Sequence, residues 1–221
     1  MKALLLCGGE GTRLRPFTHT QPKALLPLAH QPILFHILDT LAATTIREVV
    51  IIIGPNGKPI VELLRKTNPW GFDFTFVDQP KPLGLAHTVL LAREVLGNTP
   101  FLMYLGDNVL DEPLRPLVNR FVREKPDALL LLRRVKNPRH FGVARINGQN
   151  VVHVEEKPNE PQSNLALVGV YLFSPAIHQA VQVISPSPRG ELEITDAIQQ
   201  LIAEGKNVVY HLFSGWWKDT G

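Results

Sequence analysis

Continuous hydrophobic runs alternate with segments of helical hydrophobic spacing from the N-terminus to about residue 132. Runs such as VVIII and LLLLL are hydrophobic at every position, which is typical of strands buried on both faces. The expected strands are Ala3 to Cys7, Val49 to Ile53, Phe74 to Val77, Phe101 to Leu105 and Ala128 to Leu132. The expected helices are Ile33 to Ala42, Pro59 to Lys66, Leu85 to Leu96 and Leu114 to Glu124. This alternation predicts a mostly parallel sheet covered by helices on both faces.

The pattern changes after Arg139, where strands become short and turn signals frequent. Strands are expected at Phe141 to Ile146, Val151 to Glu155 and Leu165 to Phe173, separated by Asn-Gly and Lys-Pro turns. They indicate an antiparallel extension or lid over the sheet. A helix from about Glu191 to Glu204, closed by Gly205, and a strand from Val208 to Phe213 complete the pattern. Without repeats or linker-like segments, a single domain spanning residues 1–221 is expected.

Composition narrows the class of protein. The 221 residues are 44% hydrophobic and 19% charged, as in a folded protein with a sizeable core. A formal net charge of +3 without a run of like charge does not favour nucleic acid or a membrane surface as partner. The single Cys7 cannot form an internal disulfide, and Lys2 and a short strand follow Met1 where a signal peptide would begin. A cytoplasmic protein is therefore expected.

The segment Leu4 to Pro27 carries the strongest chemical signal. The first predicted strand ends in Gly8, Gly9 and Gly11, and the cations Arg13 and Lys23 follow in a polar loop. Glycines let main-chain N–H groups approach an anion closely, and the cations match phosphate oxygens, so the segment predicts a phosphate cradle. A structural turn with solvated cations is the alternative.

Two phosphate-binding motifs are absent from this loop. No Gly-Lys-Ser/Thr follows Gly8 at the distance of a Walker A sequence, and Leu14 occupies the third glycine position of the dinucleotide fingerprint. The eight histidines form no HExxH motif, no zinc-type Cys/His spacing occurs, and no GxSxG elbow is found. Metallo-hydrolase and serine-hydrolase chemistry are therefore disfavoured.

Open α/β sheets bind ligands outside the carboxyl ends of their strands, and polar residues follow the predicted strands that end at Val77 and Leu105. Asp107, after FLMYLG, suits a magnesium ligand, although a helix N-cap or turn residue is equally compatible. Asp219, in GWWKDTG, is the candidate second carboxylate; an exposed terminal residue is its alternative.

Two further strand ends offer ligand contacts. Gln79 could pair with a pyrimidine edge or a ribose, or belong to a structural proline-rich turn. Glu156 and Lys157 could hold sugar hydroxyls and a phosphate, or form an exposed strand end.

Taken together, these segments resemble the sugar-1-phosphate nucleotidylyltransferases, and most closely the long type of glucose-1-phosphate thymidylyltransferase. The matching motifs span the chain in order: GGEGTRLRPFT, PKALLPLAHQPI, QPKPLGLAHTVLLARE, YLGDN, FGVARI, VEEKP, SNLALVGVYLF, GELEITDAI and GWWKDTG. The expected fold is a Rossmann-like three-layer α/β/α arrangement with an antiparallel sugar-binding extension.

The resemblance implies roles for individual residues. The nucleotide would be held by Gly8, Gly9, Gly11, Thr12, Arg13, Lys23, Gln79 and Gly84. The sugar phosphate would be held by Gly142, Glu156, Lys157, Leu167 and Val168. Asp107 and Asp219 would hold Mg²⁺, and Arg13, Lys23 and Asp107 would be the catalytic residues.

The implied reaction joins dTTP to glucose 1-phosphate and releases pyrophosphate. A UTP- or GTP-dependent enzyme and a non-catalytic nucleotide-sugar-binding protein are the alternatives, and a homo-oligomer is compatible with all three. A nicotinamide-dependent dehydrogenase is disfavoured because no acidic residue closes the strand at Val49 to Ile53. The chain departs from the family pattern at Ala24, where Gln is typical, and it shows no hexapeptide repeat of a C-terminal β-helix.

Overall fold

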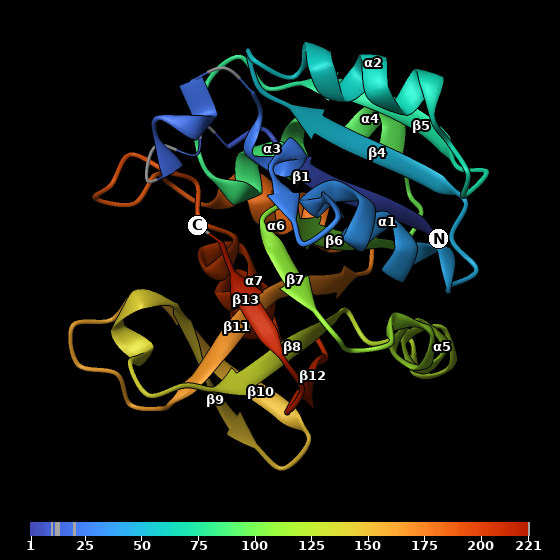
Figure 1. Ribbon diagram of the computed structural model, residues 1–221. Coiled ribbons are helices and arrows are strands. Elements are labelled where there is room, and N and C mark those ends of the chain that lie inside the picture. The colour runs from blue at the N-terminus through green and yellow to red at the C-terminus, as the bar shows by residue number, and fades with distance from the viewer. Residues whose placement is uncertain (10, 12–13, 20, 221) are drawn as a thin grey trace.

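One mixed sheet runs through the whole molecule (Figure 1). The computed structural model describes residues 1–9, 11, 14–19 and 21–220. Within these, nine strands follow the order β5-β4-β1-β6-β11-β8-β12-β10-β9. Their bounds are β1 Lys2–Cys7, β4 Glu48–Ile53, β5 Asp73–Asp78, β6 Phe101–Leu105, β8 Ala128–Arg134, β9 Gly142–Asn147, β10 Asn150–Glu156, β11 Leu165–Phe173 and β12 Val208–Leu212.

The pairing combines two parallel groups with an antiparallel strand between them. Strands β5, β4, β1 and β6 are parallel neighbours, and so are β8 and β12. Strand β11 runs antiparallel to both β6 and β8. The hairpin β9–β10 is antiparallel, as expected for residues after Arg139. Strand β10 pairs with β12 and β9 pairs back with β11, so the hairpin closes this part of the sheet on itself.

Helices cover both faces of the sheet and form two hydrophobic cores. One core contains side chains of α1 (Ile33–Ala42), α2 (Lys58–Lys66) and α5 (Leu114–Glu124). The other contains side chains of α3 (Leu85–Leu91), α4 (Arg93–Leu96), α6 (Ile177–Val183) and α7 (Ile194–Ala203). The hydrophobic runs of the strands serve both cores because successive side chains point to opposite faces. The expected three-layer α/β fold is confirmed.

Short elements complete the described part of the chain. Two small sheets pair β2 (Pro27–Leu28) with β3 (Gln31–Pro32), and β7 (Asn108–Leu110) with β13 (Trp217–Asp219). Single 3-10 turns lie at η2 (Phe17–His19), η3 (Lys23–Leu25) and η4 (Pro138–His140). No helix among the described residues combines the length and apolar character that a membrane crossing requires.

Two expected helices differ from their predicted bounds by more than one residue, and α2 begins one residue earlier than expected, at Lys58. The helix expected at Leu85 to Leu96 is divided at Ala92, and the one expected from Glu191 begins only at Ile194. The residues before Ile194 form an extended loop whose charged side chains belong to the site described next.

Candidate active site

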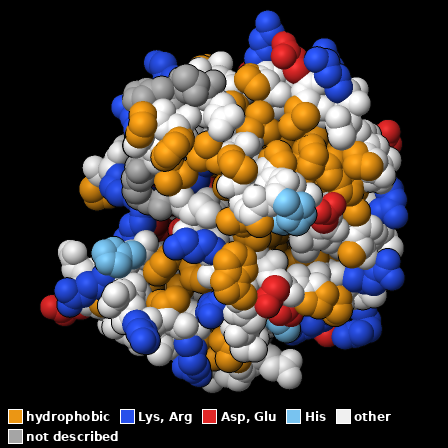
Figure 2. Space-filling model, viewed as in Figure 1, with side chains coloured by type: hydrophobic (Ala, Val, Ile, Leu, Met, Phe, Trp, Pro, Cys, Tyr) orange, Lys and Arg blue, Asp and Glu red, His pale blue; other side chains and the backbone are white. Residues whose placement is uncertain are grey.

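The carboxyl ends of β1, β5 and β6 open onto a crevice of about 200 Å³. Figure 2 shows a hollow at the left of the view, between the upper and lower parts of the molecule, with Lys and Arg side chains at its edge. The crevice is lined by residues that include Gly8, Gly9, Lys23, Ala24, Gln79, Gly84, Asp107 and Glu191. The convergence expected from parallel strand ends is therefore present in the structure.

The glycines of the first loop leave room for polar neighbours. A Cβ on Gly8 would lie 2.4 Å from Gln79 Oε1, so the Gln79 amide packs directly on the Gly8 main chain. Gly11 has a φ of +60°, and its carbonyl accepts a 2.7 Å hydrogen bond from Thr18 Oγ1. At Gly9, no atom of the described residues lies within 4 Å of the position that a Cβ would take. These features suit a loop that exposes its main chain to an anion.

Gln79 places a polar side chain in the wall of the crevice. It is 7% exposed, it lines the crevice, and its amide makes no side-chain hydrogen bond with the described residues. A buried amide normally finds hydrogen-bond partners, so an amide left available in a crevice is suited to a ligand with complementary donor and acceptor atoms.

Lys23 and Asp107 form the charged centre of the crevice. The Lys23 Nζ lies 2.8 Å from Asp107 Oδ2, and the Lys23 residue is only 8% exposed. The other carboxylate oxygen accepts a 2.8 Å hydrogen bond from Asn108 Nδ2. Nearby, burial and the charge of Asp107 raise the pKa of the Cys7 thiol to about 12, so the thiol stays protonated at neutral pH.

Asp219 approaches the same region on strand β13, paired with Asn108 on β7. Burial raises the pKa of Tyr171, and the negative charges of Glu156, Asp219 and Asp107 add to this effect. The charges of all three carboxylates therefore act on the phenol of Tyr171. The described residues hold no group of three or more His, Cys, Asp or Glu side chains able to bind a metal. Carboxylates with oxygen donors fit Mg²⁺, which commonly uses one or two of them beside substrate phosphates.

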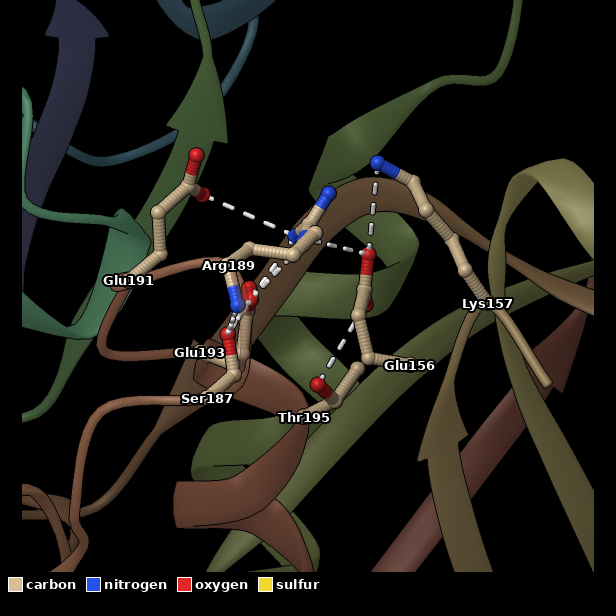
Figure 3. Close-up of polar contacts among 7 residues, drawn as sticks. All are labelled: Glu156, Lys157, Ser187, Arg189, Glu191, Glu193 and Thr195. Carbon is tan, nitrogen blue, oxygen red and sulfur yellow. Dashed lines mark hydrogen bonds and ion pairs between the residues drawn. The ribbon is translucent and has the colours of Figure 1, made fainter.

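A second charged cluster lies beside the crevice (Figure 3). Its centre is Arg189, whose Nη2 lies 2.7 Å from Glu193 Oε1 and 3.5 Å from Glu156 Oε1. Glu191, which lines the crevice, lies 3.6 Å from the same nitrogen, and Lys157 Nζ lies 3.7 Å from Glu156 Oε1. Two cations and three carboxylates therefore meet in one place, and Glu191 connects them to the crevice.

Glu193 anchors this cluster because its side chain is only 4% exposed. Its Oε1 accepts hydrogen bonds from Ser187 Oγ and from Arg189 Nε and Nη2. Burial raises the pKa of Glu156, the charge of Glu193 raises it further, and Lys157 and Arg189 oppose the shift. Arg189 thus offsets two neighbouring carboxylates while its side chain stays 40% exposed to an incoming ligand.

Three other predicted sugar-site residues lie on β9 and β11. A Cβ on Gly142 would lie 3.1 Å from Glu156 Oε2 and 3.5 Å from Leu167 Cδ1, so these three residues are neighbours. Val168 belongs to the core on the opposite face from Leu167, so it can meet a ligand only through its main chain. Lys157 has a φ of 41°, a left-handed conformation uncommon for a residue with a side chain.

The loop that carries Arg189 is tied to the loop that carries Gln79. Leu192 N donates to Leu83 O at 2.8 Å, and Ala86 N donates to Leu192 O at 3.0 Å. Gly84, with a φ of +103°, sits so close that a Cβ would lie 2.4 Å from Leu192 O. The loop of Gln79 and the loop of Arg189, which are more than a hundred residues apart in the sequence, therefore lie side by side at the crevice.

The structure brings together most residues singled out from the sequence. Lys23, Gln79, Gly84 and Asp107 line one crevice, whereas Thr12 and Arg13 lie outside the described residues. Sequence reasoning overlooked Arg189 and Glu193, although the charged run RGELE directly before a helix was an available signal. Ala24 is buried in the crevice wall and offers no side-chain hydrogen bond.

An α/β sheet carries a glycine loop, a lysine–carboxylate pair and a second charged cluster at one edge. The chain belongs to the nucleotidyl transferase family, whose model matches residues 2–221. A glucose-1-phosphate thymidylyltransferase from Streptomyces griseus is 51% identical over 222 residues, which cover 100% of this chain and 62% of that protein. The chain thus spans less than two thirds of the length of that relative.

Two solved structures are similar to this fold. A protein from Bacillus anthracis assigned as a glucose-1-phosphate thymidylyltransferase superposes with a TM-score of 0.91 at 36% identity, covering 99% of this chain and 89% of that chain. A UDP-glucose pyrophosphorylase in complex with UDP-glucose gives a TM-score of 0.91 at 25% identity, covering 99% and 92% of the two chains. Both similarities extend over nearly the whole chain.

Proposed function

We propose that the protein transfers a thymidylyl group from dTTP to glucose 1-phosphate, forming dTDP-glucose and pyrophosphate. The observation that supports this proposal is the position of Glu191, which pairs with Arg189 and lines the same crevice as Lys23 and Asp107. A triphosphate and a sugar phosphate both need cations, and their reaction requires the two anions to lie side by side. The name of the Streptomyces griseus relative agrees with this choice of substrates.

In this reaction an oxygen of the sugar phosphate attacks the α-phosphorus of dTTP, and the bond from that phosphorus to the pyrophosphate oxygen breaks. The protein is asked mainly for positioning and charge neutralisation, so no protein nucleophile is required. We assign Lys23 and Arg13 to the α-phosphate and the leaving pyrophosphate, with the main chain of Gly8, Gly9, Gly11 and Thr12 around the phosphates. Gln79 and Gly84 would contact the base.

On the acceptor side, the proposal gives Lys157 and Arg189 the phosphate of the sugar substrate. Glu156 and the main chain at Gly142, Leu167 and Val168 would hold sugar hydroxyls. The 40% exposure of Arg189 and its position between Glu156 and Glu191 support this assignment, because the cation is held in place and remains accessible.

Asp107 and Asp219 would hold a divalent cation, with Mg²⁺ the expected ion. When bound, such a cation supplies charge neutralisation at the phosphate oxygens. Both oxygens of Asp107 are engaged in the structure, one by Lys23 and one by Asn108. Release of Lys23 toward the nucleotide phosphates would free Oδ2 for the cation.

A UTP-dependent enzyme is the second candidate. Ala24 offers no hydrogen bond at a position where Gln is typical of thymidylyltransferases, and one similar structure is a UDP-glucose pyrophosphorylase. The two nucleotides differ by one methyl group, which an apolar contact discriminates by only about 1–3 kcal/mol.

Pyrophosphate release over a matrix of nucleoside triphosphates and sugar 1-phosphates, with and without Mg²⁺, tests the proposal. We expect the highest kcat/KM for dTTP with glucose 1-phosphate and no release in EDTA. A preference for UTP would establish the second candidate. Tight binding of dTDP-glucose without turnover of any pair would identify a non-catalytic nucleotide-sugar-binding protein.

The proposal also covers the domain organisation and the cellular location of the enzyme. Residues 1–221 would act as one catalytic domain, since a single sheet carries both charged clusters. A cytoplasmic location agrees with the free thiol of the buried Cys7.

A further inference from the structure

We propose that Trp217 is a positioning residue for the nucleotidyl-transfer site: its indole N–H orients the Asn108 amide, and this amide orients the carboxylate of Asp107. The inference rests on the function proposed above. It gives the GWWKDTG segment a role distinct from the metal ligand Asp219 predicted there.

The hydrogen bonds form an unbroken series. Trp217 Nε1 donates to Asn108 Oδ1 at 2.7 Å, and Asn108 Nδ2 donates to Asp107 Oδ1 at 2.8 Å. The opposite oxygen, Asp107 Oδ2, accepts from Lys23 Nζ at 2.8 Å. Trp217 is therefore three side chains away from Lys23 and need not touch a substrate to influence the site.

The chemistry of the indole fixes the direction of this series. An indole N–H can only donate, so it must face the oxygen of the Asn108 amide. The amide NH₂ group is then directed toward Asp107, where a carboxylate requires a donor. A flipped amide would place its oxygen against the carboxylate and leave the indole N–H without an acceptor, both of which are unfavourable in a buried site.

The surroundings hold Asn108 in place. Asn108 is 3% exposed, and Gly169, with a φ of +76°, leaves space for it: a Cβ there would lie 3.0 Å from Asn108 Cγ. Strand β13 pairs with β7 at Asp219 and Asn108, and the N and Oγ1 of Thr220 donate to Asp107 O at 3.0 and 2.8 Å. These contacts fix the main chain at Asp107 and Asn108. The orientation of the Asn108 side-chain amide is still free to change, and the hydrogen bond from Trp217 fixes it.

The indole also packs toward the sugar side of the crevice. Its ring lies 5.3 Å from the Phe141 ring, and the Phe141 carbonyl accepts a 3.1 Å hydrogen bond from Lys157 N. Truncation of Trp217 would therefore disturb both the Asn108 amide and the packing against Phe141. The substitution Trp217→Phe distinguishes the two effects, because it keeps an aromatic ring against Phe141 and removes only the indole N–H.

Two measurements test the inference. The first is calorimetric binding of dTTP and UTP with Mg²⁺ and in EDTA, and the second is the Mg²⁺ dependence of pyrophosphate release. Loss of a partner that orients a metal ligand typically costs about 10–100-fold in metal affinity or activity. For Trp217→Phe we expect about a tenfold rise in the half-saturating Mg²⁺ concentration and weaker nucleotide binding with Mg²⁺. Binding in EDTA and the KM for glucose 1-phosphate should stay near wild-type values.

Trp216→Phe is the matched control, because Trp216 is the adjacent tryptophan and is 51% exposed. It should leave all four quantities unchanged. In an Asn108→Ala background, Trp217→Phe should add little further effect, since the group it orients is gone. Thermal unfolding of each variant establishes that it is folded.

Equal Mg²⁺ dependence and equal nucleotide binding in folded Trp217→Phe and Trp216→Phe would overturn the inference. If the wild type binds nucleotide with Mg²⁺ but releases no pyrophosphate, the proposed reaction fails, yet the calorimetric comparison still decides the role of Trp217. If it binds no nucleotide in either condition, both proposals fall.

Discussion

Lys23 Nζ and Asp107 Oδ2 are 2.8 Å apart, so the cation of the glycine loop and the carboxylate at the end of β6 neutralise each other across the crevice. The lysine side chain is 9% exposed and the aspartate side chain 33% exposed. The ion pair therefore has a structural role and a proposed catalytic role, and substitutions can distinguish these two roles.

Asp107→Asn and Lys23→Ala should each lower kcat by about 10²–10³, the usual cost of losing one preorganised electrostatic contact. Asp107→Asn should also lower the free energy of unfolding by about 1–3 kcal/mol, less than for a fully buried pair, because it leaves the Lys23 charge unpaired. Steady-state pyrophosphate release and denaturant unfolding measure the two effects. Near-normal turnover by both variants would remove these residues from the catalytic roles proposed here.

Arg189→Ala should raise the KM for glucose 1-phosphate by about 10–100-fold, since a hydrogen bond to a charged group contributes about 1.5–3 kcal/mol. Glu193→Gln should act in the same direction, because Glu193 Oε1 accepts from both Nε and Nη2 of Arg189. The KM for the nucleotide should change little in either variant.

Glu155→Gln is the control for these two substitutions. Glu155 neighbours Glu156 in sequence, but its side chain is 56% exposed and lies 3.9 Å from His153. Initial-rate kinetics with each substrate varied in turn provide the comparison. A shift in nucleotide KM equal to the shift in sugar-phosphate KM would contradict the assignment of Arg189 to the acceptor.

Glu156→Gln should stabilise the protein at neutral pH while it lowers activity. Burial and the charge of Glu193 raise the pKa of Glu156 above its ordinary value of 4.5, so the folded state holds a proton that the unfolded chain has already released. Stability from this group therefore falls as pH rises from 4.5 through the raised pKa. The Tm advantage of the variant should be greatest at pH 7 to 8 and shrink toward pH 4, and thermal unfolding across this range measures it.

His178→Phe should stabilise the protein, and increasingly so at low pH. Both ring nitrogens of His178 are buried and meet the geometric criteria for a hydrogen bond with none of the described residues. The ring stacks on Phe101 with centroids 5.7 Å apart. Burial lowers the pKa of His178, the charge of Arg93 lowers it further, and the main chain of Gly97 opposes the shift only in part.

The pH dependence follows from the lowered pKa. The unfolded chain protonates this histidine near its ordinary value of 6.5, whereas the folded protein keeps it neutral to lower pH. The stability contribution is thus present above pH 6.5 and lost as pH falls below it. The gain from His178→Phe should be about 1–3 kcal/mol at pH 7, from removal of unsatisfied polar atoms, and larger at pH 5. An equal gain at both pH values would argue against the shifted pKa.

Local patterns in the sequence predict the main helices and strands, but they do not predict strands that form only by pairing with residues far away in the sequence. Strand β6 and helices α1 and α5 have the predicted bounds, because hydrophobic runs and helical spacing are local signals. Strands β7 and β13 are three residues each and pair across more than a hundred positions, which no local pattern can reveal. The run LALVGVYLF predicts a buried strand, but its direction between β6 and β8 is a property of the tertiary fold.

The same distinction holds for the site. Residues at strand ends, such as Lys23 after β1 and Asp107 after β6, could be expected at one edge from the parallel order alone. Arg189 follows no strand, and its approach to Glu156 depends on the path of the loop before α7. The prediction for Asp107 also left a turn residue open, and the approach of Lys23 supports the site role proposed above.

The main-chain hydrogen bonds of Leu192 to Leu83 and Ala86 have a consequence for altering substrate choice. Enlarging the pocket for a bulkier base would displace the segment around Gly84, and the absence of space beside Leu192 would pass that displacement to the loop of Arg189. Under the proposed function, a change in nucleotide selectivity would therefore also change sugar-phosphate selectivity, and variants selected for a new nucleotide should be rescreened against the full range of sugar phosphates.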